Sequence, residues 1–154
     1  MTLNTPNGTR GPQQSGPSRL MLWMNSLAAK RIAQGNGRMF GVNSLVLVTV
    51  GKKSGEERRA PMARFDGGNG SWLVVASANG GARHPAWYFN IGAHPEKVRV
   101  ALDGKVIPVQ PEELAGEERA TAWQQITTAQ PSFAKYETRT DRVLPVIRLT
   151  PIAT

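Results

Sequence analysis

The sequence predicts a single α+β domain built around a small closed or half-closed β-barrel. Five or six short segments rich in apolar and β-branched residues follow one another along the chain, separated by turns. Two of them flank Asp103-Gly104, a dipeptide typical of tight hairpins. Two or three other segments have helical character, and 154 residues suffice for one domain with a sizeable core. Helices at the periphery of a mostly antiparallel barrel satisfy these observations together.

Residues 1–17 differ from the rest of the chain in composition. Apolar side chains are nearly absent there, so burial cannot offset the entropy lost on ordering. Proline and glycine recur instead, at Pro6, Pro12, Pro17, Gly8, Gly11 and Gly16. We therefore expect a flexible N-terminal tail over residues 1–17 and one domain over residues 18–154.

A helix is expected to begin after Ser18, a favourable N-cap residue, and to end at Gly35 to Gly37. Its apolar residues have helical spacing: Leu20, Trp23, Met24 and Leu27. The apolar patch is too short for a secretory signal, so we expect a cytoplasmic protein. Because Lys30 and Arg31 follow the patch, weak peripheral membrane contact through this helix stays open as an alternative to packing on the core.

Three consecutive strands are expected next, at residues 44–50, 58–66 and 71–77, and their short connections favour an antiparallel meander. Pro85 can open a short helix that His94-Pro95 ends. Strands at 97–102 and 105–110 form the hairpin around Asp103-Gly104. A helix is expected over 112–129, with Glu112, Glu113, Glu117 and Glu118 in its opening turns, followed by a short helical piece from Pro131 and a last strand at 146–150.

The net charge of +8 is concentrated in the first 64 residues, where ten basic residues face only Glu56 and Glu57. This segregation favours an anionic partner, which composition alone leaves open among nucleic acid, an acidic membrane and a phosphorylated small molecule. The chain has no cysteine, which excludes thiol chemistry, disulfides and Cys-ligated metals. Its two histidines, His84 and His94, both precede proline and have no metal-binding spacing, so we expect no metal site.

The segment GKKSGEERR at residues 51–59 is the sharpest candidate binding loop. Its two glycines allow the backbone N–H groups to turn toward one anion, and Lys53 with Arg58 can bracket a phosphate. It is not a Walker A loop, because it enters a strand rather than a helix. Neither the Ser132-x-x-Lys135 pattern nor the residues around Ser77 have the companions that a serine hydrolase needs.

Four ordered motifs together give a more specific indication. GKKSGEERRAP, VVASANGGARHPAWYFN, AHPEKVRV and PSFAKYETRTDRVLPVIRL follow one another between about Asn43 and Pro151. In this order they closely resemble the deazaflavin-dependent nitroreductase family, which uses coenzyme F420. The resemblance implies a split β-barrel that holds this cofactor in a groove.

The resemblance also implies a set of site residues. Positions that would grip the anionic end of the cofactor are Lys52, Lys53, Ser54 and Arg58. Positions that would lie along the deazaflavin ring are Val75, Ala76, Ser77 and Ala78, with Ala86, Trp87, Tyr88, Phe89 and Asn90 completing the wall. The cofactor's phosphodiester and polyglutamate tail give the basic N-terminal half a small-molecule explanation, so nucleic acid is not the expected partner.

The implied reaction is hydride transfer from the reduced deazaflavin to an electron-poor acceptor, whose proton would come from water or from a hydroxyl such as that of Ser77 or Tyr136. Family members that reduce nitroimidazoles place several tyrosines over the acceptor, whereas the corresponding positions here are Ala63, Gln130, Phe133 and Tyr136. We therefore expect a quinone, an activated enone or a nitro compound as acceptor, with nitroimidazoles disfavoured. A non-catalytic module that binds an anionic ligand, lipid or RNA, an FMN-dependent reductase and a homodimer stay open from the sequence.

Overall fold

The computed structural model describes residues 3, 5–11, 38–39, 42–77 and 80–152. The helix expected after Ser18, and with it the suggested membrane contact, lies outside the described residues. Within them the elements are β1 (Arg38–Met39), β2 (Val42–Val50), β3 (Glu57–Ala63), β4 (Phe65–Gly68), β5 (Ser71–Val75), α2 (Ala86–Ala93), the 3-10 helix η2 (Pro95–Lys97), β6 (Arg99–Leu102), β7 (Lys105–Glu113), α3 (Gly116–Ala129), α4 (Ser132–Thr138) and β8 (Val146–Pro151).

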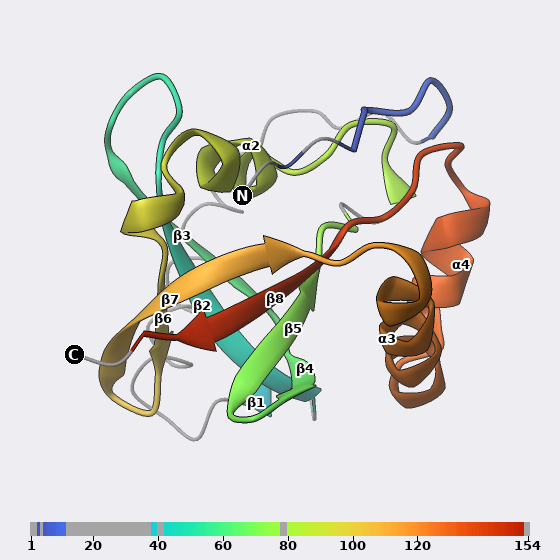
Figure 1. Ribbon diagram of the computed structural model, residues 1–154. Helices are drawn as coiled ribbons and strands as arrows, with labels where there is room; N and C mark the ends of the chain where they lie inside the picture. The colour runs from blue at the N-terminus through green and yellow to red at the C-terminus, as the bar shows by residue number, and fades with distance from the viewer. Residues whose placement is uncertain (1–2, 4, 12–37, 40–41, 78–79, 153–154) are drawn as a thin grey trace.

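The described strands form one curled antiparallel sheet of eight strands, in the order β1-β2-β6-β7-β8-β5-β4, with β3 paired to β2. Strand β7 connects the two halves of this sheet, as Figure 1 shows. Its first residues, Lys105 to Pro108, pair with β6, and its later residues, Val109 to Glu113, pair with β8. The expected α+β split barrel with peripheral helices is confirmed.

Strand β5 separates two apolar clusters because its side chains alternate between its faces. Val74 and Ala76 belong to the cluster that α2 covers with Tyr88. Leu73 and Val75 belong to the second cluster, beneath α3. Figure 1 shows α2 at one end of the sheet and α3 and α4 beside its other side. No helix among the described residues is long and apolar enough to cross a membrane.

The expected meander is wrong in one respect. The predicted strand 58–66 is two strands: β3 pairs with β2, while β4 pairs with β5. Arg64 separates them because its backbone N–H donates to Asn43 O (2.9 Å) and its Nε donates to Ser44 O (2.9 Å). The third strand ends at Val75, two residues before the predicted end, and its other partner is the distant β8.

The helix predicted over 112–129 begins only at Gly116. Glu112 and Glu113 lie in β7, paired with Arg148 and Ile147 of β8, and not in the opening turns of a helix. The sequence did not distinguish the two cases, because exposed glutamates occur both at the end of a strand and in the first turn of a helix. The other predicted elements in the described residues, α2, the β6–β7 hairpin, α4 and β8, are present.

Residues 5–11 lie within the predicted flexible tail, yet the structure docks them on the barrel. Thr5 Oγ1 donates to Glu113 Oε1 (2.6 Å), and Gly8 N–H donates to Ala82 O (2.7 Å). The N–H groups of Thr9 and Arg10 both donate to Asp141 Oδ1, at 2.7 and 2.8 Å. The composition gave no sign of this, because backbone and hydroxyl hydrogen bonds make these contacts rather than apolar side chains. We call residues 5–11 the N-terminal strap.

Candidate functional site

The loop between β2 and β3 carries the predicted anion-binding side chains. Lys52, Lys53, Ser54 and Arg58 are all exposed. The loop is fixed to α2, because Lys52 N–H donates to Asn90 Oδ1 at 3.0 Å and the Asn90 amide also donates to Thr49 Oγ1 at 3.3 Å. Figure 1 shows this loop rising beside α2. The structure therefore brings two of the predicted cofactor-binding segments together: the β2–β3 loop and α2.

Hydrogen bonds within the protein occupy several of the backbone N–H groups that the glycines of this loop were expected to turn toward an anion. Gly51 N–H donates to Glu56 O (2.8 Å), Gly55 N–H donates to Gly51 O (3.0 Å), and Glu56 N–H donates to Ser54 Oγ (3.1 Å). With Lys52 N–H bound to Asn90, four of the loop's amides already have partners. The side chains of the loop supply further donors, and among them Arg58 forms an exposed ion pair with Glu56 (3.3 Å) that contributes little stability.

Helix α2 presents its predicted wall residues in different environments. Ala86 is exposed, and Trp87 and Phe89 are half-buried against the first cluster. Tyr88 is 2% exposed, and its hydroxyl donates to Glu113 Oε1 (3.0 Å) while accepting from Thr5 N–H (3.1 Å). Burial, with a smaller contribution from Glu113, raises the pKa of Tyr88 to about 12.

The end of β5 is mostly buried. Val75 is 7% exposed and Ala76 is fully buried, while Ser77 is half-buried. Ala78 lies outside the described residues. The side chain of Ala76 packs in the first cluster, so a flat ring here would meet the edge of the backbone rather than this methyl group.

The predicted acceptor residues gather near Ser77. Phe133 and Tyr136 of α4 meet edge to face, with ring centroids 5.7 Å apart, and Phe133 meets Phe65 in the same way at 5.8 Å. A Cβ atom on Gly80 would lie 2.7 Å from Tyr136 O, so the turn after Ser77 touches α4 directly. Gly80 N–H donates to Ser77 O at 2.8 Å. The structure therefore brings Ser77 and Tyr136, the two predicted proton donors, to adjoining segments.

Two other predicted acceptor residues flank this aromatic group. Gln130 is half-buried at the end of α3, and its carbonyl accepts from Phe133 N–H at 3.2 Å. Ala63 is half-buried at the end of β3, two residues before Phe65. Gln130 thus adjoins the aromatic residues directly, whereas Ala63 is linked to them only along the chain, through Phe65.

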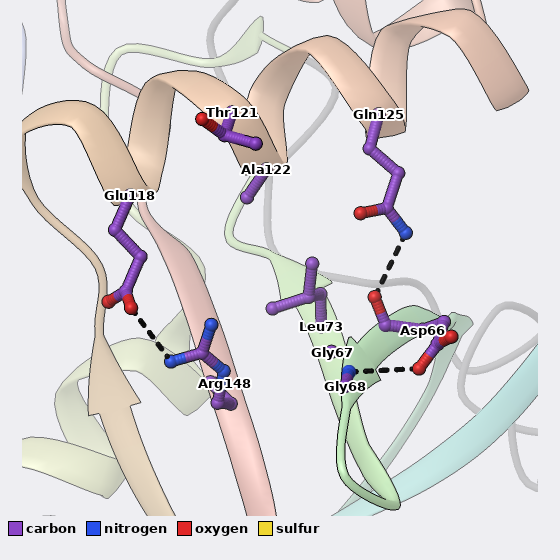
Figure 2. A pocket seen from close by; sticks show the side chains of 9 residues that line it. All are labelled: Asp66, Gly67, Gly68, Leu73, Glu118, Thr121, Ala122, Gln125 and Arg148. Atoms are coloured by element: carbon purple, nitrogen blue, oxygen red, sulfur yellow. Dashed lines mark hydrogen bonds and ion pairs between the residues drawn. The ribbon is translucent and has the colours of Figure 1, made fainter.

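A hollow of about 480 Å³ lies elsewhere, between the β4–β5 hairpin and α3 (Figure 2). Gln125 Nε2 donates across it to Asp66 O (2.9 Å), and Arg148 forms an ion pair with Glu118 (3.3 Å). None of the predicted site residues lines it. Because Arg148 pairs with Glu118 and the Asp66 carboxylate accepts from Gly68 N–H (2.9 Å), we do not assign the reaction to this hollow.

Two site residues that sequence reasoning missed are Arg142 and His84. Arg142 is 5% exposed and His84 is 3% exposed, and Arg142 Nη1 lies 3.0 Å from His84 Nδ1. Arg142 also donates to the carbonyls of Ala76 (2.8 Å) and Ser77 (2.5 Å). Both residues occur in the motifs that carry the family resemblance, but neither an arginine nor a histidine by itself indicates a buried side chain that binds backbone carbonyls.

These features define a split-barrel protein with a cationic loop fixed to an aromatic helix at one end of the sheet and an aromatic pair on α4. The comparison with protein families agrees, because the model of the family "F420H(2)-dependent quinone reductase" matches residues 23–151. The chain belongs to this family. It is therefore an oxidoreductase that depends on coenzyme F420, as the motifs predicted.

Individual relatives support the same assignment. The F420H(2)-dependent quinone reductase Rv1261c of Mycobacterium tuberculosis (strain ATCC 25618 / H37Rv) is 33% identical over 109 residues, which cover 70% of this chain and 72% of that protein. The solved structure of an F420-H2 dependent reductase (FDR-A) is 41% identical, with a TM-score of 0.61 over 69% of this chain and 92% of that one. A structure described as a domain-swapped dimer is 34% identical, with a TM-score of 0.62 over 84% of this chain and 96% of that one.

Proposed function

We propose that this reductase transfers hydride from reduced coenzyme F420 to a quinone-type acceptor at the end of the barrel between α2 and α4. The observation that carries this proposal is the hydrogen bond from Lys52 N–H to Asn90 Oδ1, which fixes the cationic loop beside the aromatic helix. The name of the relative Rv1261c supports quinones as the acceptor class. Other electron-poor acceptors, such as activated enones and nitro compounds, belong to the same chemistry.

The loop side chains fit the anionic end of this cofactor. Lys52 and Lys53 are exposed, and no ion pair among the described residues engages either of them. Arg58 can exchange its exposed partner Glu56 for a phosphate, since such a surface pair is worth about 0–1 kcal/mol. Ser54 adds a hydroxyl beside them. We assign the phosphodiester and polyglutamate groups chiefly to these charged side chains.

The ring end of the cofactor fits between α2 and the end of β5. Trp87 and Phe89 of α2 supply partly exposed aromatic surface, and Asn90 fixes the loop at the other end of the helix. Val75, Ala76 and Ser77 form the opposing strand end, and the exposed residue Ala86 is the first residue of α2. Tyr88 contributes from within the core, by holding Glu113 and Thr5.

Reduced coenzyme F420 supplies the hydride, so the protein's task is mainly orientation and protonation. Phe133 and Tyr136 present aromatic edges and faces suited to a planar acceptor. Ala63 lies two residues before Phe65, which contacts Phe133, and the Gln130 carbonyl accepts from Phe133 N–H. The hydroxyls of Ser77 and Tyr136 are the groups we assign to proton donation to the reduced acceptor.

We also propose a cytoplasmic enzyme that forms a homodimer. The domain-swapped dimer among the similar structures supports the pairing, since it matches this chain over most of its length. Light scattering coupled to size exclusion tests it, with a mass near twice 16.7 kDa expected. A mass of one chain at all concentrations would contradict the dimer and leave the reductase assignment intact.

The decisive experiment compares cofactors. Purified protein is titrated by fluorescence with coenzyme F420, FMN and FAD, and oxidation of reduced F420 is then followed with menadione as a soluble quinone. We expect F420 to bind in preference to both flavins and menadione to be reduced. Binding of FMN but not F420, or F420 binding without turnover of any quinone, enone or nitro acceptor, would contradict the proposal.

Variants then test the loop. Lys53→Ala combined with Arg58→Ala removes two charge-assisted contacts and is expected to weaken F420 binding by about 3 kcal/mol or more, on the order of 100-fold. Lys105→Ala, at the β6–β7 turn on the far end of the barrel, is the charge control and should change Kd by less than about twofold. A loss of under about tenfold for the loop variant would place the anionic end elsewhere.

A further inference from the structure

Arg142 is a buried cation at the point where β5 ends. It lies in the segment between α4 and β8, and Gly8 of the N-terminal strap packs against it. Its guanidinium makes four hydrogen bonds: Nε to Gly81 O (2.7 Å), Nη1 to Ala76 O (2.8 Å) and to His84 Nδ1 (3.0 Å), and Nη2 to Ser77 O (2.5 Å). All of its partners belong to the segment that leads from β5 to α2.

The charge of Arg142 has no carboxylate partner in the described part of the chain, where the ion pairs involve other residues. Burial accordingly lowers the pKa of Arg142, although arginine stays protonated throughout the physiological range. Since the guanidinium gains no ion pair, its contribution here is geometric. A planar fork can hold three backbone carbonyls at once, which a lysine ammonium on a flexible stem cannot do in the same way.

His84 fixes the orientation of this fork. Its Nδ1 accepts from Arg142, so its Nε2 carries the proton and donates to Thr5 O at 2.8 Å. The His84 ring also packs against Tyr88 and Phe89 of α2, with centroid distances of 4.4 and 5.9 Å. The residue therefore connects three parts of the molecule: the strap, the aromatic helix and the guanidinium.

Two of the carbonyls that Arg142 holds, those of Ala76 and Ser77, lie where the proposed reaction requires a well-defined position of the backbone. Ala76 and Ser77 form the strand end assigned to the cofactor ring, and Ser77 also carries a proposed proton-donating hydroxyl. The Ser77 carbonyl accepts from Gly80 N–H as well, and Gly80 touches Tyr136. A displacement of about 1 Å at such a place can cost on the order of 100-fold in rate.

We propose that Arg142 is a positioning residue for hydride transfer, whose guanidinium, oriented by His84, holds the carbonyls of Ala76 and Ser77 and thereby fixes the strand end and the Ser77 hydroxyl relative to Tyr136. This inference rests on the proposed function. It differs from the binding role of the loop, because Arg142 is buried and all four of its N–H donors described above are already used.

The test replaces Arg142 with lysine, which keeps the charge and removes the fork. We expect kcat for menadione reduction to fall by at least about tenfold while the Kd for F420 changes by less than about threefold. In the protein without cofactor, hydrogen exchange of the Gly80 amide, which depends on Ser77 O, should accelerate by at least about tenfold. The loop variant Lys53→Ala with Arg58→Ala should show the reverse split, a raised Kd with little change in kcat at saturation.

Arg119→Lys is the matched control for a structural loss. Arg119 is half-buried and also donates to a backbone carbonyl, Leu144 O (2.8 Å), but it belongs to α3 and contacts none of residues 76–84 in the described hydrogen bonds. We expect it to lower Tm and to leave kcat and Gly80 exchange unchanged. If Arg142→Lys lost no more kcat than Arg119→Lys at a similar loss of Tm, the proposal would be overturned.

His84→Asn decides the question if Arg142→Lys does not fold. Asparagine keeps an acceptor near the position of Nδ1 but loses the bond to Thr5, so kcat should fall less than in His84→Ala, with Kd for F420 unchanged in both. Equal wild-type kcat in both variants would overturn the role of Arg142 and His84. A wild-type protein that oxidises no reduced F420 would overturn the proposed function and this inference together, and is thereby distinguished from failure of the inference alone.

Discussion

Nδ1 of His84 lies 3.0 Å from Nη1 of Arg142, and both side chains are buried. A guanidinium has no acceptor, so the imidazole must supply the lone pair at this atom. The opposite nitrogen, Nε2, then donates to Thr5 O. The fold thus requires a neutral His84 in one tautomer, and a second proton on the ring would place two donors against each other.

The stability of the protein should therefore depend on the protonation of His84. Burial lowers the pKa of His84 and the charge of Arg142 acts in the same direction, whereas the hydrogen bond to Thr5 and the charge of Glu113 raise it. Because the folded-state pKa is below the unfolded value of about 6.5, the unfolded chain binds more protons in the window below 6.5. The free energy of unfolding should fall as the pH is lowered from 7.5 through 6.5 to 5.

Urea unfolding at a series of pH values measures this dependence, and His84→Asn is the reference because it cannot titrate. The wild-type protein should lose more stability than the variant between pH 7.5 and 5, so the two curves approach each other on acidification. His94 is retained in both proteins and so cancels from the difference. Parallel curves would show that His84 titrates equally in the folded and unfolded states.

Gly8 is the point at which the N-terminal strap touches Arg142. A Cβ atom there would lie 2.8 Å from Arg142 Cβ and 2.9 Å from Arg142 N, with Asp141 Oδ1 also in contact. Gly8→Ala should therefore lift the strap and cost about 1–3 kcal/mol of unfolding free energy. The hydrogen bonds of Thr9 and Arg10 to Asp141 should open with it.

Gly92→Ala is the control for this prediction. Gly92 is exposed in α2, and a Cβ atom there would meet only Leu3, at an ordinary distance of 3.8 Å. Alanine is the better helix former by roughly 1 kcal/mol, so Gly92→Ala should be neutral or stabilising. Chemical denaturation and amide exchange of residues 5–11 compare the two variants, and equal stability would mean that the strap does not rest on Arg142.

The sequence predicted correctly those elements that depend on a few neighbouring residues, such as the hairpin turn at Asp103-Gly104. Asp103 and Gly104 both have positive φ, 52° and 75°, as the hairpin type expected from this dipeptide requires. The split of the second strand at Arg64 could not be predicted in this way, because it depends on carbonyls of Asn43 and Ser44 about 20 residues earlier. Likewise, nothing local shows that β7 pairs with two different strands.

The same distinction applies to the site. The charge and glycines of the β2–β3 loop indicated an anion-binding segment, and the family motifs indicated the aromatic helix. Arg142 gave no such signal, because its partners are backbone carbonyls up to 66 residues away and any residue type can provide them. The N-terminal strap was missed for the same reason, since its contacts are made by N–H groups and hydroxyls.

Asn90 should matter for cofactor binding without touching the cofactor's phosphate. Asn90→Ala removes the acceptor for Lys52 N–H and leaves the loop attached only through the strands on each side. We expect F420 affinity to fall by about tenfold, as one lost hydrogen bond at about 1.4 kcal/mol implies, with kcat at saturating F420 nearly unchanged. Fluorescence titration and steady-state kinetics measure the two quantities separately.

Thr49→Val is the control for Asn90. It removes the hydroxyl that accepts from the Asn90 amide (3.3 Å) but leaves the bond to Lys52. Its Kd for F420 should stay within about threefold of the wild-type value. If Thr49→Val weakened binding as much as Asn90→Ala, the effect would come from general loosening beneath α2 rather than from the position of the loop.

Tyr136→Phe tests the acceptor side of the site, because it removes one hydroxyl and keeps the ring. The edge-to-face contact with Phe133 (5.7 Å) and the Arg139 guanidinium over the ring (5.6 Å) do not need this hydroxyl, so Tm should change little. A group that donates a proton in the transition state typically contributes 100-fold or more, although Ser77 can compensate in part. We therefore expect kcat for menadione to fall by about tenfold or more with the Kd for F420 unchanged, and unaltered turnover would remove Tyr136 from the mechanism and leave Ser77 or water as the donor.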